Sequence, residues 1–191
     1  IPDQILANGS LGHQTLLQFG YPADRVAIGG ALRLREFGML PHDPDAPVFV
    51  ALPFDSQVAA EMVAAVRPLA NEDRVFIIRS HPMTPFEFTE SDGIQKAGAT
   101  LQGQNALSAV IYAGTSVGLE AVLGGLPTIR FQPTIGMDVD VMPESFDIPT
   151  ATSTTLVATL ANLAKPAFPG IDAVFSRPDM DLWRETLGGT A

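Results

Sequence analysis

Two polar clusters in this chain combine the residue types that hold a phosphate group. The first, Arg79-Ser80-His81-Pro82, offers a guanidinium and an imidazole, and its proline keeps His81 in an extended or turn conformation. The second, Gly114-Thr115-Ser116, offers hydroxyls and backbone N–H groups at the start of a predicted helix. The two clusters together predict a site for a nucleotide phosphate. A strand-ending turn and an ordinary helix cap are the simpler interpretations of each cluster alone.

The elements that must position these clusters are buried strands. Apolar runs at 75–78 and 110–112 each end at one of the clusters, and a third run at 48–52 lies upstream. Continuous apolar runs of this kind are typical of strands covered on both faces of a parallel sheet. The carboxyl ends of parallel strands meet at one edge of the sheet, where ligands bind at the switch point. We therefore expect both clusters to lie at that edge.

Helical patterns alternate with the strands. Apolar residues recur at helical spacing from Asp55 to Leu69, and Val117–Leu123 forms a short helix that two glycines end. The remaining predicted elements are strands at 5–7, 25–30, 99–101 (a weak edge strand) and 127–131, a short helix within 83–97, and helices at 10–19, 154–163 and 178–187. This alternation predicts an α/β fold with a doubly wound, Rossmann-like parallel sheet.

A run of turn-forming residues at 41–47, PHDPDAP, divides the chain. We predict that residues 1–46 are the end of an N-terminal domain with a hinge and that residues 47–165 are a nucleotide-binding domain. Residues 166–191 would form a C-terminal helix that packs back across the hinge. The chain opens with Ile-Pro-Asp-Gln, without a methionine or a signal-peptide pattern. We therefore expect a piece of a longer protein whose N-terminal partner domain is largely absent.

Charge and composition exclude several classes of partner. The formal net charge of −10 argues against a nucleic-acid partner, because nucleic-acid binding needs clustered lysine and arginine. The apolar runs are far shorter than the roughly 20 residues of a membrane-spanning helix. The absence of cysteine excludes disulfides, thiolate metal sites and a cysteine nucleophile, and it fits a cytoplasmic protein.

Two acidic features need their own interpretation. Glu120 lies one turn into the helix after Gly114, where a carboxylate either interacts with the helix dipole or accepts hydrogen bonds from paired ribose hydroxyls. Asp138-Val139-Asp140 has the spacing to hold a divalent cation, but two aspartates in an acidic loop are more often solvated. No histidine pair has metal-ligand spacing, and neither a Walker loop nor GxGxxG occurs. We therefore expect ribose binding at Glu120 and no metal site.

These motifs support a resemblance to a known family. From about Val48 to Phe131 the chain resembles the C-terminal, donor-nucleotide-binding domain of GT-B fold glycosyltransferases. The run IIRSHP is similar to the R/K-x-HP segment of bacterial capsule and surface-carbohydrate transferases, including sialyl- and Kdo-transferase-like groups. The run GTSVGLEAVLGGLPTI is similar to their S/T-x-x-x-x-E-A…G-x-P block. The opening, ILANGSLGHQTLLQFGYPADRVAIGGALR, resembles the last N-domain strand, helix and connecting strand before the hinge.

The resemblance implies roles for single residues. His81, and Thr115 and Ser116 with their amides, would bind the donor phosphate, Glu120 would bind the ribose, and the helix near 179–187 would pack on the N-terminal domain. It also implies a nucleotide-sugar donor and a carbohydrate or lipid-linked acceptor, with peripheral membrane association of the full protein left open. Catalysis would need no cofactor and no bound metal, because the helix dipole and side chains stabilise the leaving phosphate. The catalytic base in such enzymes usually comes from the N-terminal domain, so we assign no catalytic residue and expect the chain to be inactive alone.

Two other functions share these features. A UDP-GlcNAc 2-epimerase-like enzyme has the same fold, an HP element and a glutamate-bearing helix, but that family tends to carry paired glutamates where this chain has only Glu120 before Ala121. A non-catalytic module that binds a nucleotide sugar or a partner is the other alternative. The Asp-Gly pair that precedes the HP segment in one sialyltransferase group is missing upstream, so nothing in the sequence selects CMP-sialic acid as donor.

Overall fold

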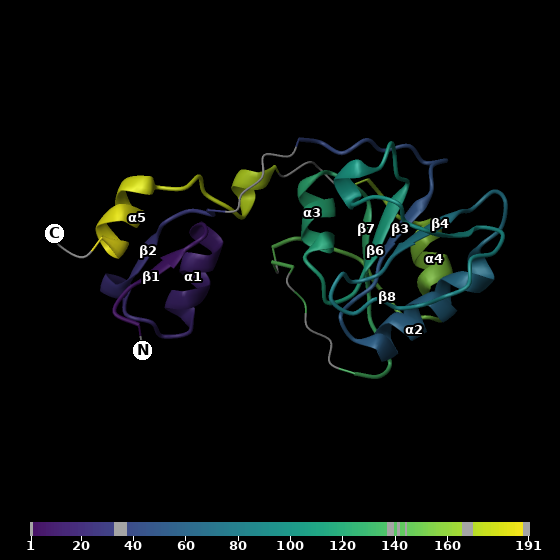
Figure 1. Ribbon diagram of the computed structural model, residues 1–191, viewed down its shortest axis with the longest axis horizontal. Coiled ribbons are helices and arrows are strands. Elements are labelled where there is room, and N and C mark those ends of the chain that lie inside the picture. Colours follow the sequence, from purple (N-terminus) through teal and green to yellow (C-terminus); the bar gives the residue numbers. More distant parts are fainter. Residues whose placement is uncertain are drawn as a thin grey trace. The chain divides into compact units, whose positions relative to one another are not determined.

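The structure of the chain is a computed structural model that describes residues 2–32, 38–136, 140, 142–143, 145–165 and 170–188. Two compact units make up the fold (Figure 1). The larger unit is Gly38–Phe168, and the smaller unit joins Ile1–Phe37 to Pro169–Ala191. Both ends of the chain therefore belong to one unit, and the middle of the chain forms the other.

The proline-rich run at 41–47 belongs to the larger unit. Just before it, the Leu40 N–H donates a hydrogen bond of 2.9 Å to the Gly124 carbonyl. Within it, His42 forms a parallel β-bridge with Leu107. The sequence pattern predicts that residues up to 46 belong to the N-terminal domain and hinge. These backbone contacts instead join the segment to the larger unit.

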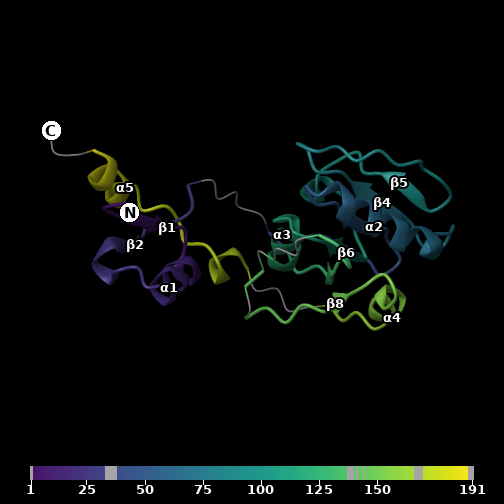
Figure 2. The ribbon, with the colours of Figure 1, turned by 90° about the horizontal axis from the view of Figure 1, so that it is seen from below.

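Six parallel strands form the sheet of the larger unit, which confirms the predicted α/β, doubly wound architecture. The strands are β3 Val48–Ala51, β4 Phe76–Arg79, β5 Ile94–Lys96, β6 Ala109–Tyr112, β7 Thr128–Phe131 and β8 Thr150–Ala151. Their order in the sheet is β5-β4-β3-β6-β7-β8, the order of Rossmann-like sheets. Figure 2 shows β4 and β5 on one side of the unit and β8 on the other. The switch point of this topology lies between β3 and β6.

Helices cover both faces of the sheet. Figure 1 shows α3 (Val117–Leu123) on one face, and α2 (Ser56–Val66) and α4 (Leu156–Ala161) on the other. An apolar core lies on each face of the sheet, and successive residues of β3 point into opposite cores. Val50 packs on the α2 side, whereas Phe49 and Ala51 pack on the α3 side. All four residues of β3 are buried, which is why this strand has a continuous apolar sequence.

The predicted start of α2 is confirmed. The Asp55 carboxylate accepts hydrogen bonds from the N–H groups of Gln57 at 2.8 Å and Val58 at 3.3 Å, as an N-cap residue does. A 3₁₀ turn, η2 (Arg67–Leu69), follows the helix and takes its apolar pattern to the predicted end.

The two edge strands of the sheet, β5 and β8, were not predicted from the sequence. β5 falls in the segment expected to hold a short helix, and the weak strand expected at 99–101 is absent, since Leu101–Gly103 is a 3₁₀ turn, η3. β8 consists of two residues and pairs with the end of β7. Short edge strands carry few apolar residues, and this explains why their pattern is weak in the sequence.

The smaller unit is built on a pair of parallel strands, β1 (Ile5–Ala7) and β2 (Val26–Ile28). Between them the chain forms α1 (Ser10–Gln18) and a 3₁₀ turn, η1 (Ala23–Arg25). The C-terminal segment adds a further 3₁₀ turn, η4 (Ile171–Ala173), and α5 (Met180–Leu187).

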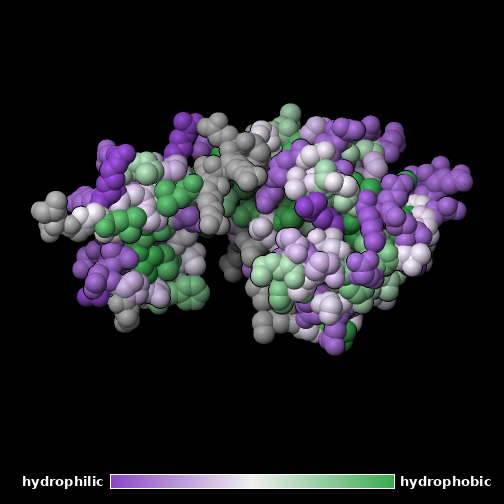
Figure 3. Space-filling model, in the orientation of Figure 1, coloured by the Kyte–Doolittle hydropathy of each residue, from purple (hydrophilic) through white to green (hydrophobic). Residues whose placement is uncertain are grey.

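The C-terminal segment is bonded directly to the ends of β1 and β2. The Ser176 N–H donates to the Asn8 carbonyl at 2.9 Å, and the Trp183 Nε1–H donates to the Gly29 carbonyl at 2.7 Å. Figure 3 shows apolar side chains on the visible face of this unit. The large apolar side chains that remain exposed in it include Phe19, Tyr21, Ile28, Leu32, Met180 and Leu187.

Candidate functional site

Sheet register brings the two predicted clusters to the same level. Ala51, the last residue of β3, pairs with Arg79 on β4 and with Tyr112 on β6. His81 and Gly114 each lie two residues beyond the end of one of the two flanking strands, β4 and β6. Neighbouring strands lie about 4.8 Å apart, so these two exits from the sheet are separated by roughly 10 Å. Both clusters therefore lie at the carboxyl edge, on either side of β3 at the switch point.

His81 lies in a tight turn with a defined ring orientation. Its carbonyl accepts a hydrogen bond of 3.2 Å from the Thr84 N–H, and its Nδ1 accepts one of 3.3 Å from the Met83 N–H. A neutral imidazole whose Nδ1 is an acceptor carries its proton on Nε2. The turn therefore leaves an Nε2–H donor for a ligand oxygen.

The loop after β3 supports the His81 turn. The Phe54 ring contacts the imidazole edge to face, with centroids 5.6 Å apart and planes at 81°. The Phe54 carbonyl also accepts a hydrogen bond of 3.0 Å from the Thr84 hydroxyl. Phe54 is 60% exposed and Met83 is 78% exposed, so apolar surface borders the imidazole. The sequence did not single out these two residues.

Gly114 turns the chain from β6 toward α3. It has a φ of +54°, in the left-handed region that glycine adopts without strain. α3 begins at Val117, so Thr115 and Ser116 precede the helix instead of forming its first turn. The Thr115 hydroxyl accepts a hydrogen bond of 3.4 Å from the Val117 N–H, whereas the Ser116 side chain makes no capping bond. Ser116 thus keeps a hydroxyl for other contacts.

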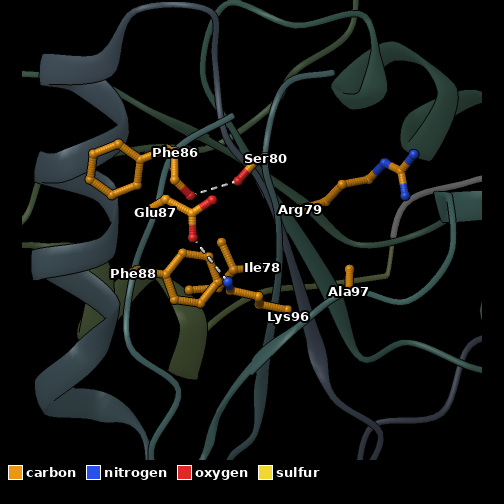
Figure 4. A pocket seen from close by; sticks show the side chains of 8 residues that line it. All are labelled: Ile78, Arg79, Ser80, Phe86, Glu87, Phe88, Lys96 and Ala97. Carbon is orange, nitrogen blue, oxygen red and sulfur yellow. Dashed lines mark hydrogen bonds and ion pairs between the residues drawn. The ribbon is translucent and has the colours of Figure 1, made fainter. Parts of the chain in front are cut away.

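Arg79 belongs to the α3 face of the sheet. Its neighbours in β4 alternate, with Ile78 in the core under α2 and Ile77 against the core under α3. Figure 4 shows the guanidinium extending away from Phe86 and Phe88. Within the part of the chain that the structure describes, the Arg79 side chain makes no hydrogen bond or ion pair. A half-buried cation is thus available beside the His81 turn.

Glu120 has a partner that the sequence did not reveal. The amide of Gln102, in η3, donates a hydrogen bond to Oε2 of Glu120. Glu120 is half-buried and lies in the first turn of α3. In the sequence it follows Thr115 and Ser116 by five and four residues. The structure therefore places a carboxylate, oriented by an amide, on the helix that follows Gly114.

A hollow of about 300 Å³ adjoins Arg79 at the ends of β4 and β5 (Figure 4). An ion pair of 3.1 Å between Lys96 and Glu87 lies across it. The Ser80 hydroxyl donates a hydrogen bond of 2.9 Å to the Phe86 carbonyl, which fixes the segment that forms its wall. Arg79 lines this hollow from β4, but its guanidinium extends away from Phe86 and Phe88.

The Asp-x-Asp pair is only partly within the described residues, because Asp138 lies outside them. Asp140 is not a free carboxylate: its Oδ2 forms an ion pair of 3.2 Å with Arg130, and its Oδ1 accepts a hydrogen bond of 3.1 Å from the Tyr112 hydroxyl. Over residues 2–32, 38–136 and the other described positions, no group of three His, Asp or Glu side chains could hold a metal ion. Asp140 is accordingly a structural residue that joins the loop to β6 and β7.

Comparisons of the chain with protein-family models, with curated proteins and with solved structures find no match. None of the helices in the described part of the chain has the length and apolar character needed to cross a bilayer. The functional assignment therefore depends on the residues and geometry of the site.

Proposed function

We propose that this chain is the donor-nucleotide-binding part of a glycosyltransferase that moves a sugar from a nucleotide sugar to a surface-polysaccharide acceptor. The observation that carries the proposal is the common level of Arg79, Ala51 and Tyr112. It supports a phosphate position between the His81 turn and the Gly114 turn, at the switch point where Rossmann-like sheets bind ligands. Glu120 would then take the ribose of the same nucleotide.

The chemistry of transfer fits these groups. The bond from the anomeric carbon to the phosphate oxygen breaks, and the acceptor oxygen forms the new glycosidic bond. Negative charge develops on the departing phosphate, where the Arg79 guanidinium and the His81 Nε2–H can stabilise it without a metal. The proton of the acceptor hydroxyl passes to a base that the proposal does not assign to this chain. A carbohydrate or lipid-linked acceptor and a cytoplasmic location complete the proposal.

Calorimetric titration of the 191-residue chain with UDP, CMP and GDP tests the proposal. At least one nucleotide should bind, and His81→Ala should weaken it by about 1.5–3 kcal/mol through loss of a charge-assisted hydrogen bond. Glu120→Ala should weaken the same nucleotide. His42→Ala is the matched control, because His42 lies outside the site and its β-bridge to Leu107 is made by the backbone.

Two results would contradict the proposal. A folded sample that binds none of the three nucleotides excludes a donor-binding role. Equal losses in His81→Ala and His42→Ala would show that the effect is not local to the carboxyl edge. Binding without turnover, when the chain is assayed with any N-terminal partner domain, would favour a non-catalytic nucleotide-sugar module instead.

A further inference from the structure

The contact between Gln102 and Glu120 joins two segments that lie 18 residues apart in the sequence. Glu120 is the acidic residue in the first turn of α3, and Gln102 is in the η3 turn before β6. The partner of the carboxylate is a neutral amide. A neutral donor orients a carboxylate and leaves its full negative charge for other donors.

The turn that carries Gln102 is itself firmly held. Leu101 is 3% exposed and is part of the core between the sheet and α3. The Gln104 side-chain amide donates to the carbonyls of Ala99 at 3.0 Å and Thr100 at 3.3 Å. The Gly103 N–H donates to the Thr100 carbonyl at 3.0 Å. These contacts fix the backbone of η3, and from it the exposed side chain of Gln102 reaches Glu120.

The carboxylate keeps capacity for a ligand with two hydroxyls. A carboxylate offers about four acceptor positions, and Gln102 occupies one of them at Oε2. In the described part of the chain Oε1 of Glu120 has no hydrogen-bond partner. The 2′ and 3′ hydroxyls of a ribose are two adjacent donors, and a single oriented carboxylate satisfies both.

We propose that Gln102 is a positioning residue that holds Glu120 for the ribose diol, so that the site selects ribonucleotides over 2′-deoxyribonucleotides. This inference rests on the proposed function, since it assumes that a nucleotide binds at the carboxyl edge. It goes further by naming the sugar of the nucleotide as the feature that is discriminated and Gln102 as the residue that makes discrimination possible.

The test compares affinities of UDP, CMP and GDP with those of dUDP, dCMP and dGDP, for the full chain by calorimetry. The ribonucleotide should bind about tenfold more tightly than its 2′-deoxy counterpart, the value of one hydrogen bond to a charged acceptor. Gln102→Leu removes the amide without changing net charge, and it should reduce this ratio to about twofold or less. Gln95→Leu, on the exposed part of β5, is the matched control and should keep the wild-type ratio.

A double-mutant cycle separates a role through Glu120 from a general effect on the fold. Glu120→Gln should reduce the ribose preference on its own, and adding Gln102→Leu to it should change nothing more. If circular dichroism shows that Gln102→Leu does not fold, Gln102→Asn replaces it, because its shorter amide withdraws from Glu120 with less change in polarity.

The outcomes distinguish this inference from the proposed function. Binding that depends on His81 but shows equal affinity for the ribonucleotide and its 2′-deoxy counterpart overturns the inference and leaves the proposed function standing. A normal ribose preference in folded Gln102→Leu overturns the role of Gln102. Absence of binding by all six nucleotides overturns both.

Discussion

Arg79 and Tyr112 lie at one level of the sheet, because each is the register partner of Ala51 on the strand between them. The hydrogen bonds between β3, β4 and β6 fix the relative positions of these two residues, independently of the loops that follow the strands. Arg79 thereby shares a sheet face with Tyr112, on which α3 packs. The carboxyl edge thus combines a cation from β4 with the Gly114 turn after β6, on either side of β3.

This placement predicts a selective effect of Arg79→Gln. Loss of the charge should weaken nucleotide binding about tenfold or more, because hydrogen bonds to charged groups are worth about 1.5–3 kcal/mol. The free energy of unfolding should change by less than about 0.5 kcal/mol, since Arg79 makes no ion pair with the described residues. The control is Arg74→Gln, because Arg74 is exposed and lies just before the first residue of β4, away from the carboxyl edge. Equal losses of affinity in the two variants would contradict the assignment of Arg79.

Gly118→Ala should destabilise the larger unit. A Cβ at this position would lie 2.5 Å from atoms of the Tyr112 ring, so α3 could not keep its distance from β6. We expect the overpacking to cost about 1–3 kcal/mol, which outweighs a gain in helix propensity of about 1 kcal/mol. Urea unfolding measures the difference. Gly98→Ala, where an added Cβ meets nothing within 4 Å, should leave the midpoint nearly unchanged.

The sequence was sufficient for the central part of the fold. Runs such as Val48–Ala51 are buried on both faces and show no alternation, so their parallel pairing was predictable. β5 was not, because Gln95 and Lys96 are exposed and only Ile94 reaches the core. Leu101 was misread as a strand residue, although it is buried as the anchor of a single turn. Edge elements depend on one or two buried side chains, which leave too little periodicity to detect.

The site was predictable to a similar extent. His81 and Gly114 follow apolar strands directly, so their place at the sheet edge followed from the local pattern. The partner of Glu120 could not be predicted in this way, because Gln102 lies 18 residues away in the sequence and belongs to no motif. The role of Asp140 was also missed, since its ion pair with Arg130 depends on how the loop returns to β7. Contacts between distant segments need the folded chain.

Asp140→Asn should lower stability through loss of the Arg130 ion pair. The Asp140 side chain is 20% exposed, and its Oδ1 also accepts hydrogen bonds from the Tyr112 hydroxyl at 3.1 Å and the Met142 N–H at 3.0 Å. Asparagine has no charge to pair with the guanidinium, and its amide nitrogen cannot accept a hydrogen bond. We therefore expect the free energy of unfolding in urea to fall by about 1–3 kcal/mol.

Asp181→Asn is the control for that variant. Asp181 pairs with Arg184 at 2.6 Å, but its side chain is 94% exposed. An exposed pair contributes about 0–1 kcal/mol, so this variant should unfold close to wild type. If the two aspartate variants lose equal stability, the Asp140 network has no special structural role.

Gly30→Ala should unfold the smaller unit at lower denaturant concentration. Gly30 has a φ of +74°, and an added Cβ would lie 2.1 Å from the Arg177 carbonyl oxygen. The strained backbone costs about 1–2 kcal/mol and the overlap about 1–3 kcal/mol more, because the C-terminal segment must move away. Trp183 reports on this unit specifically, since it is the single tryptophan of the chain and donates to the Gly29 carbonyl. The midpoint of its fluorescence change measures the effect.

Gly20→Ala separates the two causes, because Gly20 has a φ of +85° but nothing within 4 Å of an added Cβ. It should therefore lose only the smaller, conformational part. Equal shifts in the two variants would mean that the segment around Arg177 does not pack against Gly30 in solution.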